Sequence, residues 1–369
     1  MHEDMLIVGG YGQVGRIIST RLASHYPGRV IVAGHNISGG GHPSLAGTEA
    51  SKIRFRQFDI RQPKQFDAAL LGIRLAVVSV ERADDAFVRA CLTHGVHYLE
   101  VATSHERLAE IVALRSLALE KGVAVIPGAG LIPGLSNILA AHCAQGMASV
   151  AHADIFVLLG LGDTHGTDAV RWMLDQGRHR FSVATRQGAE SFANYSDPRW
   201  VHFPGDTVPR MAYRFNFGDQ HVLPESIGAQ AASSRLCFDS QIATQLLALV
   251  AQVGLLRLVR GNMAVWLARV LRHIPIGGDR FALQAEVASA TGERVTASVT
   301  GNREADATGI VTALAARLLY EETVVKGVHF LENILTLAAI RGELEFAGMR
   351  VWANNSSNKN TGPDAGGPH

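Results

Sequence analysis

The sequence predicts an α/β protein with a doubly wound parallel sheet, followed by a second α+β domain built on a mostly antiparallel sheet. Through residues 5–142, short apolar stretches of strand length alternate with patterns of helical spacing. Near-continuous apolar strands of this kind are typical of parallel sheets that are covered on both faces. Further along, FALQAEVASATGERVTASVTG (residues 281–301) contains two alternating stretches joined by a TGE turn, which predicts an antiparallel hairpin.

The composition argues against several classes of protein. Basic residues number 34 and acidic residues 33, a net charge of +1, so the chain has no basic field for nucleic acid. The three cysteines, at positions 91, 143 and 237, lie far apart, which argues against a disulfide framework and fits a reducing cytoplasm. The 16 histidines form no metal-binding motif, and we expect no metal site. The start, MHEDML, lacks the basic region of a signal peptide.

A glycine cluster follows the first expected strand. Residues 6–15 read LIVGGYGQVG, with Gly10, Gly12 and Gly15 on a G-x-G-x-x-G spacing. An amphipathic helical pattern and a second apolar strand, residues 29–34, complete a βαβ unit. In such a unit the first glycine permits a sharp turn, the second lets a pyrophosphate approach the backbone, and the third lets helix and strand pack closely. The first amides of the helix then face the phosphates, so the pattern predicts a dinucleotide site.

The following apolar stretches extend this unit into a larger sheet. We expect strands at residues 53–60, 75–80, 97–103 and 123–128, and a long helix over residues 105–122. Ligands of such sheets bind in the crevice beyond the carboxyl ends of the strands. The residues that we expect to bind the cofactor therefore lie in the glycine turn and at strand ends: Gly10, Tyr11, Gly12, Gln13, Val14, Gly34, His35, Asn36, Asp59, Ile60, Val80, Glu81, Ala102 and Thr103.

The end of the second strand indicates which cofactor is preferred. Enzymes that use NAD usually place an acidic residue there, where it holds the ribose 2′-hydroxyl. This chain has no acidic residue between Tyr26 and Thr48. A 2′-phosphate is therefore not repelled, and we expect NADP, with NAD as the less favoured alternative. The candidate donors to that phosphate are His35, Asn36, Ser38, Arg54 and Arg56.

A second informative stretch is IPGAGLIPGLSNILAAH, residues 126–142. Two Pro-Gly pairs bracket a loop, and a helix is expected to begin near its end, so the first amides of that helix point back towards the crevice. A rigid bend between two domains is the alternative interpretation. The residues of this loop that we expect to bind substrate are Gly130, Leu131, Pro133, Gly134 and Asn137.

Three stretches together resemble the saccharopine dehydrogenase-like oxidoreductases: VGGYGQVGRIISTRLA, HYLEVAT and VIPGAGLIPGLSNILA. The resemblance covers residues 5–142 and is looser at residues 159–175 and 307–319, and the Pro-Gly loop is its most specific part. It implies an N-terminal Rossmann domain, a second α+β domain and a C-terminal segment that returns to the first. We therefore divide the chain into a dinucleotide-binding domain (1–145), a substrate and oligomerisation domain (146–304), C-terminal helices that pack on the first domain (305–350) and a disordered tail (351–369).

The stretch LGLGDTHGTDAVRWMLD, residues 159–175, is expected to form a strand, a turn and a helix. It brings His165 close to two carboxylates, Asp163 and Asp168. A histidine beside a carboxylate is a candidate proton donor during hydride transfer, so we predict His165 and Asp163 as catalytic residues. The alternative is that these side chains only cap the helix and pin the turn.

Residues 241–259, QIATQLLALVAQVGLLRLV, are almost entirely apolar, and a basic amphipathic stretch, NMAVWLARVLRH, follows. We expect a pair of helices that is buried or forms the interface of a homodimer. Docking on a membrane surface is the alternative. A transmembrane span is disfavoured, because the chain on either side is expected to fold as one enzyme.

These patterns predict a cytoplasmic, NADP-dependent oxidoreductase of the saccharopine dehydrogenase type. We expect hydride transfer to or from an imine or ketone carbon of a small amine- or amino-acid-derived substrate. Two alternatives remain open. The first is an enoyl-type reductase that acts on the C=C bond of a lipid-like substrate, and the second is a non-catalytic NADP-binding sensor or scaffold.

Overall fold

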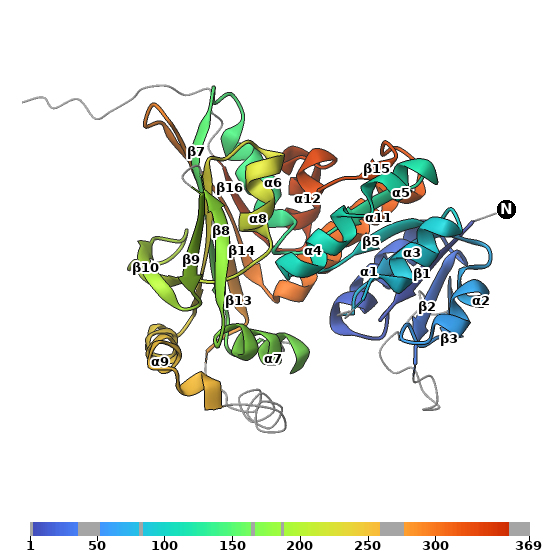
Figure 1. Ribbon diagram of the computed structural model, residues 1–369, viewed down its shortest axis with the longest axis horizontal. Helices are drawn as coiled ribbons and strands as arrows, with labels where there is room; N and C mark the ends of the chain where they lie inside the picture. The colour runs from blue at the N-terminus through green and yellow to red at the C-terminus, as the bar shows by residue number, and fades with distance from the viewer. Residues whose placement is uncertain are drawn as a thin grey trace, which may run out of the picture.

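The computed structural model describes residues 3–35, 52–80, 84–163, 167–185, 188–258 and 277–353. Asn36, Glu81 and His165 lie outside these residues, as does the amphipathic stretch 262–273. The described residues form two lobes, each built around one seven-stranded sheet (Figure 1). The predicted fold class is confirmed, since one sheet is entirely parallel and the other is mostly antiparallel.

The parallel sheet of the first lobe has the strand order β15-β6-β5-β4-β1-β2-β3. Its strands are β1 (Asp4–Val8), β2 (Val30–Gly34), β3 (Ile53–Gln57), β4 (Ile73–Val78), β5 (His97–Glu100), β6 (Ala124–Pro127) and the short β15 (Gly327–Val328). Alternate side chains enter two separate cores, because successive residues of a strand point to opposite faces. Met5 and Ile7 belong to one core, while Leu6 and Val8 belong to the other.

Helices cover both faces of this sheet. On the Met5 face lie α1 (Gln13–His25) and, from much later in the chain, α11 (Glu304–Tyr320). The opposite face is covered by α2 (Phe66–Leu70), α3 (Ala86–Thr93), α4 (His105–Val112) and α5 (Arg115–Glu120). The single long helix that we expected over residues 105–122 is therefore wrong, because α4 and α5 are separate helices. The interruption lies at Leu114, whose φ of −86° and ψ of 7° are not helical.

The sheet of the second lobe has the order β10-β11-β12-β7-β13-β14-β16, in which only β12 and β7 run parallel. Its strands are β7 (Val150–Leu159), β10 (Ser196–Val201), β11 (Arg210–Arg214), β12 (Ala231–Phe238), β13 (Arg280–Ser289), β14 (Arg294–Asn302) and β16 (Arg350–Ala353). The predicted hairpin is confirmed as β13 and β14. The other elements are α6 (Leu135–Ala144), α7 (Thr167–Gln176), α8 (Asp219–Ser226), α9 (Gln241–Gln252), α12 (Leu337–Phe346) and a hairpin of β8 (Arg180–Thr185) and β9 (Gly188–Ala193).

The C-terminal segment joins both lobes. Helix α11 packs directly on α1, since a Cβ atom at Gly309 would lie only 2.5 Å from Cγ2 of Ile17. Farther on, Val351 pairs with Val299, so β16 is an edge strand of the second sheet. Residues 351–353 therefore form a strand instead of the beginning of a tail, because the side chain of Val351 is buried in the core.

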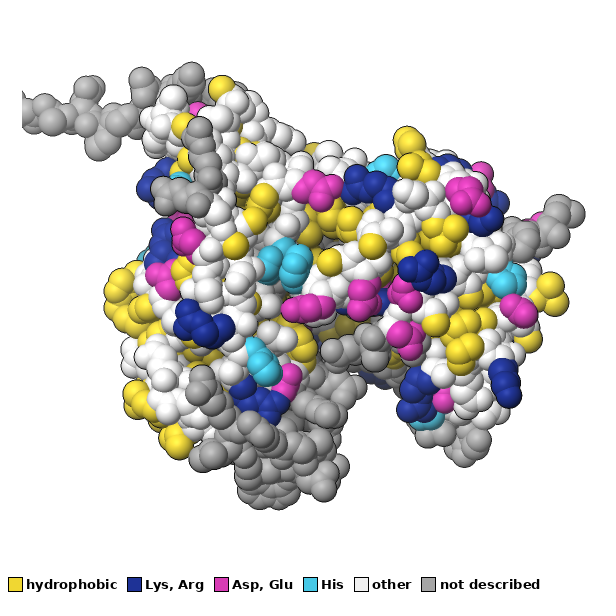
Figure 2. All heavy atoms as spheres, viewed as in Figure 1, with side chains coloured by type: hydrophobic (Ala, Val, Ile, Leu, Met, Phe, Trp, Pro, Cys, Tyr) yellow, Lys and Arg dark blue, Asp and Glu magenta, His cyan; other side chains and the backbone are white. Residues whose placement is uncertain are grey.

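Helix α9 belongs to the pair of helices that we expected to be buried or to form the interface of a homodimer. It is not buried within one chain, because Ile242, Leu246, Leu249 and the C-cap residue Val253 are each more than half exposed. Its role in an interface stays a prediction. Only Thr244 and Ala248 of this helix are buried. Hydrophobic side chains lie on the surface around α9 (Figure 2). Among the described residues, no helix combines the length and the apolarity needed to span a bilayer.

We predict that Gly309→Ala lowers the free energy of unfolding by about 1–3 kcal/mol, because the new methyl group meets the branch point of Ile17. The control is Gly342→Ala, within α12, where a Cβ atom would meet nothing within 4 Å. That change should raise the stability by up to about 1 kcal/mol through helix propensity. Urea denaturation measures both, and equal stabilisation by the two substitutions would contradict the close packing of α11 on α1.

Candidate functional site

The turn between β1 and α1 contains three glycines that are packed too closely for a side chain. Gly9 has φ +81°, and a Cβ atom there would lie 2.4 Å from Cγ1 of Val80. Gly10 does not have a positive φ, but it packs so closely that a Cβ atom would lie 2.8 Å from Cγ1 of Val32. The sharp turn that we assigned to Gly10 is therefore made by Gly9, one residue earlier. Gly15 has the predicted packing role, since its Cβ atom would lie 2.3 Å from the carbonyl oxygen of Gly9.

Gly12 leaves the start of α1 open to a ligand. It is the N-cap residue, it is exposed, and a Cβ atom there would meet only the carbonyl oxygen of Gly9, at 3.2 Å. The first turn of α1 holds no acidic side chain. The first amides of a helix have no intrahelical partners and carry a partial positive charge. The turn therefore fits the pyrophosphate of a dinucleotide without a steric or electrostatic obstacle.

The ends of β2 and β3 lie beside this turn. The ring of Tyr11 stacks on that of Phe55, with 6.1 Å between the centroids. A Cβ atom at Gly34 would lie 2.9 Å from Cδ2 of Tyr11. The expected phosphate donor Arg54 is instead paired with Asp4 at 2.5 Å, at the amino end of β1, so it lies at the wrong edge of the sheet. Arg56 lies nearer, in a surface groove of about 700 Å³ that is also lined by His35, Gln57, Asp59 and Lys64.

Asp59 and Ile60 follow β3, where we expected contacts to the cofactor. The carboxylate of Asp59 accepts two hydrogen bonds from the guanidinium of Arg61, at 2.9 and 3.0 Å. These hydrogen bonds hold the pKa of Asp59 far below its usual range. Asp59 is therefore anionic but already engaged by Arg61, while Ile60 is buried.

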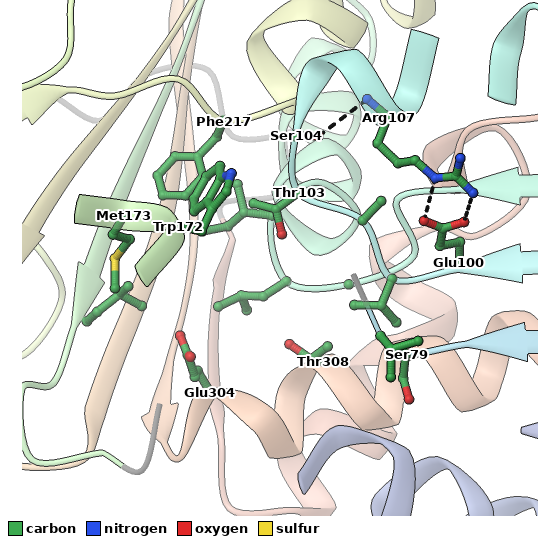
Figure 3. A pocket seen from close by; sticks show the side chains of 17 residues that line it. Ser79, Glu100, Thr103, Ser104, Arg107, Trp172, Met173, Phe217, Glu304 and Thr308 are labelled. Carbon is green, nitrogen blue, oxygen red and sulfur yellow. Dashed lines mark hydrogen bonds and ion pairs between the residues drawn. The ribbon is translucent and has the colours of Figure 1, made fainter. Parts of the chain in front are cut away.

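A cavity of about 270 Å³ lies between the two lobes, beyond the carboxyl ends of β4 and β5 (Figure 3). Five residues that the sequence singled out line it: Val80, Ala102, Thr103, Gly130 and Leu131. The other lining residues are Ser79, Glu100, Val101, Ser104, Arg107, Ile132, Leu159, Trp172, Met173, Phe217, Glu304 and Thr308. The predicted crevice therefore also receives residues from the second lobe and from α11.

Three of the predicted substrate residues, Pro133, Gly134 and Asn137, do not line the cavity but lie in the segment next to its wall residues Gly130, Leu131 and Ile132. A Cβ atom at Gly134 would lie 2.3 Å from the carbonyl oxygen of Gly130, and these two residues form a bridge that closes the loop around Pro133. The side chain of Asn137 is buried, where it accepts a hydrogen bond from the N–H of Gly134 and donates one to Glu332 at 3.0 Å. None of the three residues is in the cavity wall.

A buried ion pair forms one end of the cavity, and no pattern in the sequence indicated it. Arg107 donates to both carboxylate oxygens of Glu100, at 2.8 and 2.7 Å (Figure 3), and Tyr98 donates its hydroxyl hydrogen to the same carboxylate. Burial opposes the charge of Arg107, but the hydrogen bonds and the charge of Glu100 outweigh it and raise the pKa of Arg107. A glutamate at the end of a strand and an arginine seven residues later are too common to signal such a pair.

The opposite wall is aromatic. The rings of Trp172 and Phe217 lie 5.9 Å apart and both line the cavity, with Phe215 behind them at 5.6 and 4.8 Å. Trp172 comes from α7, and Phe217 lies between β11 and α8. No pattern in the sequence predicts that Trp172 and Phe217 are neighbours, because they are 45 positions apart and belong to different elements of the second lobe.

Helix α11 forms a third side. The side chains of Glu304 and Thr308, one turn apart, extend from it toward the cavity (Figure 3). Asp163, which we predicted to be catalytic, is buried and accepts a hydrogen bond from the N–H of Glu304 at 3.0 Å. This hydrogen bond satisfies the first N–H of α11. A proton-donor role for His165 stays a prediction, because that residue lies outside the described part of the chain.

Comparisons with known proteins bear on the fold. No family model and no curated protein sequence matches the chain. Among solved structures, saccharopine dehydrogenase (L-Glu forming) from Saccharomyces cerevisiae aligns over 95% of this chain and 100% of its own, with 14% identity and a TM-score of 0.64. The chain has the fold of that dehydrogenase. The predicted resemblance to saccharopine dehydrogenase is thereby confirmed for the fold.

Two further structures align over nearly the whole chain with lower TM-scores. A meso-dapdh mutant with DAP from Clostridium tetani aligns over 92% of this chain and 99% of its own, with 14% identity and a TM-score of 0.41. GenD2 from gentamicin A biosynthesis, in complex with NAD, aligns over 96% and 97%, with 13% identity and a TM-score of 0.44.

A stacked pair of histidines joins the two lobes near the cavity. His105 begins α4 and His221 lies in α8, and their rings are 3.8 Å apart and nearly parallel. His221 also shares a hydrogen bond of 2.8 Å with the side chain of Asn216. Burial, followed by the positive charges of His105 and Arg214, lowers the pKa of His221 to about 3. Burial also lowers the pKa of His105, although the charge of Glu106 opposes this.

These pKa values predict loss of stability in mild acid. In the folded protein His221 stays neutral, whereas in the unfolded chain it takes up a proton as the pH falls through its ordinary value of 6.5. The unfolded state then binds more protons, so this group alone should lower the free energy of unfolding by about 2 kcal/mol between pH 7 and pH 5. Urea denaturation at the two pH values should show a smaller loss in His221→Gln. An identical loss in both proteins would contradict the assignment.

Proposed function

We propose that the protein is an NAD(P)-dependent oxidoreductase that transfers hydride to or from an imine or ketone carbon of a small amine- or amino-acid-derived substrate. One observation carries the proposal: a turn suited to a pyrophosphate and a cavity suited to a small substrate lie at the same edge of one parallel sheet. In open α/β sheets this edge is where dinucleotides bind. The name of the structure from S. cerevisiae, saccharopine dehydrogenase, supports the same class of reaction.

The residues of this chain would bind and orient the reactants. When bound, the reduced dinucleotide supplies a hydride. The open start of α1 at Gly12 would hold the diphosphate, and Val80, Ala102 and Thr103 would surround the nicotinamide. The aromatic wall at Trp172 would exclude water from the reacting carbon. Holding both reactants in this way accounts for most of what the protein must add, since the cofactor carries the chemistry.

We propose NADP as the preferred cofactor. The support is the lack of an acidic residue after β2 together with three basic side chains, His35, Arg56 and Lys64, that line the groove beside the end of β2. Arg56 donates to the carbonyl oxygen of Ala69 at 2.6 Å, which holds its guanidinium at the groove. Arg and Lys side chains are the usual partners of a 2′-phosphate.

A second candidate function is reduction of a C=C bond in a lipid-like substrate. It is favoured by the apolar part of the cavity wall, which includes Leu131, Ile132, Leu159 and Met173. Assays with an enoyl substrate and with a 2-oxo acid plus an amine separate the two reactions, because each predicts NADPH oxidation with one substrate only. NADPH binding without any turnover would instead support a sensor or scaffold.

We also propose that two copies associate in the cytoplasm. The exposed apolar stripe of α9, at Ile242, Leu246, Leu249 and Val253, has the spacing of a helix-packing surface. The three cysteines are buried thiols, which fits a reducing compartment. Docking of the same stripe on a membrane surface is the alternative. A monomer in sedimentation equilibrium that binds anionic vesicles would favour that alternative and contradict the dimer.

Gly12→Asp tests the dinucleotide site. Aspartate is a favoured N-cap residue, and Gly12 has φ −68°, so the helix should remain folded. The added carboxylate would face the diphosphate, and we expect NADPH binding to weaken by about 100-fold or more through like-charge repulsion. The neutral Gly12→Asn measures the effect of size alone.

Fluorescence titration of the unsubstituted protein and both variants gives the affinities. The unsubstituted protein should bind NADPH more tightly than NADH. Unchanged NADPH binding in Gly12→Asp would contradict the proposed function, and tighter binding of NADH would contradict only the choice of cofactor.

A further inference from the structure

We infer that a groove between α1, α11 and the end of α12 binds a small organic molecule through a phosphate group. The groove has a volume of about 470 Å³, which is within the usual size of a binding site for small molecules. No described residue lines both this groove and the cavity between the lobes. The inference therefore goes beyond the proposed function and does not rest on it.

Three arginines line the groove. Arg16 and Arg21 belong to α1, and Arg303 is the residue before α11. Among the described residues that line the groove, a single carboxylate faces these arginines, that of Asp306. A guanidinium is a planar fork of N–H groups that matches the oxygens of a phosphate, and several of them together suit its double negative charge. The groove therefore has the charge and the hydrogen-bond donors of a phosphate site.

Arg16 has hydrogen-bonding capacity that the protein does not use. Its Nε atom is buried, and in the described structure no acceptor reaches it. A buried N–H group without an acceptor is unfavourable, so a ligand oxygen placed beside it is favoured. The other two arginines are only partly engaged, since Arg21 donates one N–H to Glu343 at 3.0 Å and Arg303 lies 3.4 Å from Asp306. A phosphate in the groove would supply acceptors for all three.

The amino-terminal halves of α1 and α11 form the groove together. Ile17 packs on Gly309 near the beginning of the two helices, and Tyr26, which follows α1, donates its hydroxyl hydrogen to Glu321, which follows α11. The two helices therefore run side by side in the same direction (Figure 1). The amino end of a helix carries a partial positive charge, so both ends add to the attraction of the arginines for an anion.

The backbone of Arg303 also points to a binding role. Its φ of +57° and ψ of 88° are left-handed, a conformation that a residue with a long side chain rarely adopts. The residue before a helix is usually Ser, Thr, Asp, Asn or Gly, and Arg303 makes no side-chain cap. Strained backbone is concentrated at active sites and ligand-binding sites. We interpret the strain as a consequence of holding a guanidinium at the end of the groove.

The remaining described wall of the groove carries no charge. Ile17, Ile310 and Ala347 give it an apolar surface, and Thr20 adds a hydroxyl group. A free phosphate ion would contact the arginines but would leave this apolar surface uncovered. We therefore assign the ligand to the phosphomonoesters, with the organic part of the molecule packed on the two isoleucines.

The test uses Arg16→Gln and Arg303→Gly, with Arg341→Gln as the control. Arg341 belongs to α12, where it pairs with Glu345 at 2.7 Å, and it does not line the groove. Calorimetry at constant ionic strength measures binding of phenyl phosphate, inorganic phosphate and benzoate to the whole protein. Each titration is made with and without saturating NADP⁺, and urea denaturation measures the stability of every variant.

We expect phenyl phosphate to bind the unsubstituted protein more tightly than inorganic phosphate, which lacks the ring, and more tightly than benzoate, which lacks the second charge. Arg16→Gln and Arg303→Gly should each weaken phenyl phosphate binding by about 10- to 100-fold, the effect of losing charge-assisted hydrogen bonds. Arg303→Gly should at the same time raise the stability, because glycine adopts left-handed geometry without strain. Its loss of binding therefore cannot come from unfolding. Arg341→Gln should leave the affinity within about twofold.

Equal phenyl phosphate affinity in Arg16→Gln and in the unsubstituted protein would overturn the inference. Binding of benzoate or of inorganic phosphate as tight as that of phenyl phosphate would overturn the assignment to a phosphomonoester. Loss of phenyl phosphate binding at saturating NADP⁺ would overturn the separate site, because the anion would then occupy the dinucleotide site. Failure of NADP⁺ to bind would contradict only the proposed function, since the titrations without NADP⁺ still measure the groove.

Discussion

The packing of α11 on α1 is the contact on which the candidate site depends. Gly309 lets the two helices approach until Ile17 lies where a side chain would be. Helix α11 is thereby held on the parallel sheet, although nearly 280 residues separate it from α1 in the sequence. Its first turn then lies at the carboxyl edge of that sheet, with Glu304 and Thr308 at the cavity. The site is therefore completed by the end of the chain rather than by the first lobe alone.

Charge is distributed in the cavity so that its two ends differ. At the first-lobe end, Glu100 and Arg107 satisfy each other, and the removal of either would leave a buried charge. At the other end, Glu304 lies among apolar and aromatic side chains. A buried ion pair rarely adds net stability, so we interpret the first pair as a device that fixes the end of β5 beside the cavity.

Local patterns predicted the parts of this molecule that local geometry determines. The glycine spacing predicted the turn before α1, and alternating apolar stretches predicted β13 and β14, because both signals lie within one βαβ unit or one hairpin. The sharp turn was misplaced by one residue, since Gly9 and Gly10 are adjacent and the sequence does not distinguish which of the two glycines adopts the positive φ. The apolar composition of α9 predicted burial in the core or in a dimer interface, and within one chain only two of its residues are buried.

Contacts between distant segments were beyond such patterns. Nothing in the sequence near Asp163 indicates that it caps α11, some 140 residues later. The same is true of Trp172 and Phe217, which come from separate elements of the second lobe and meet residues of the first lobe in the cavity wall. A crystal structure with NADPH bound tests the account most directly. We predict the diphosphate at the amides that begin α1 and the nicotinamide ring beside Thr103, with Glu304 across the remaining space. A dinucleotide bound elsewhere, or a nicotinamide ring outside the cavity, would contradict the account.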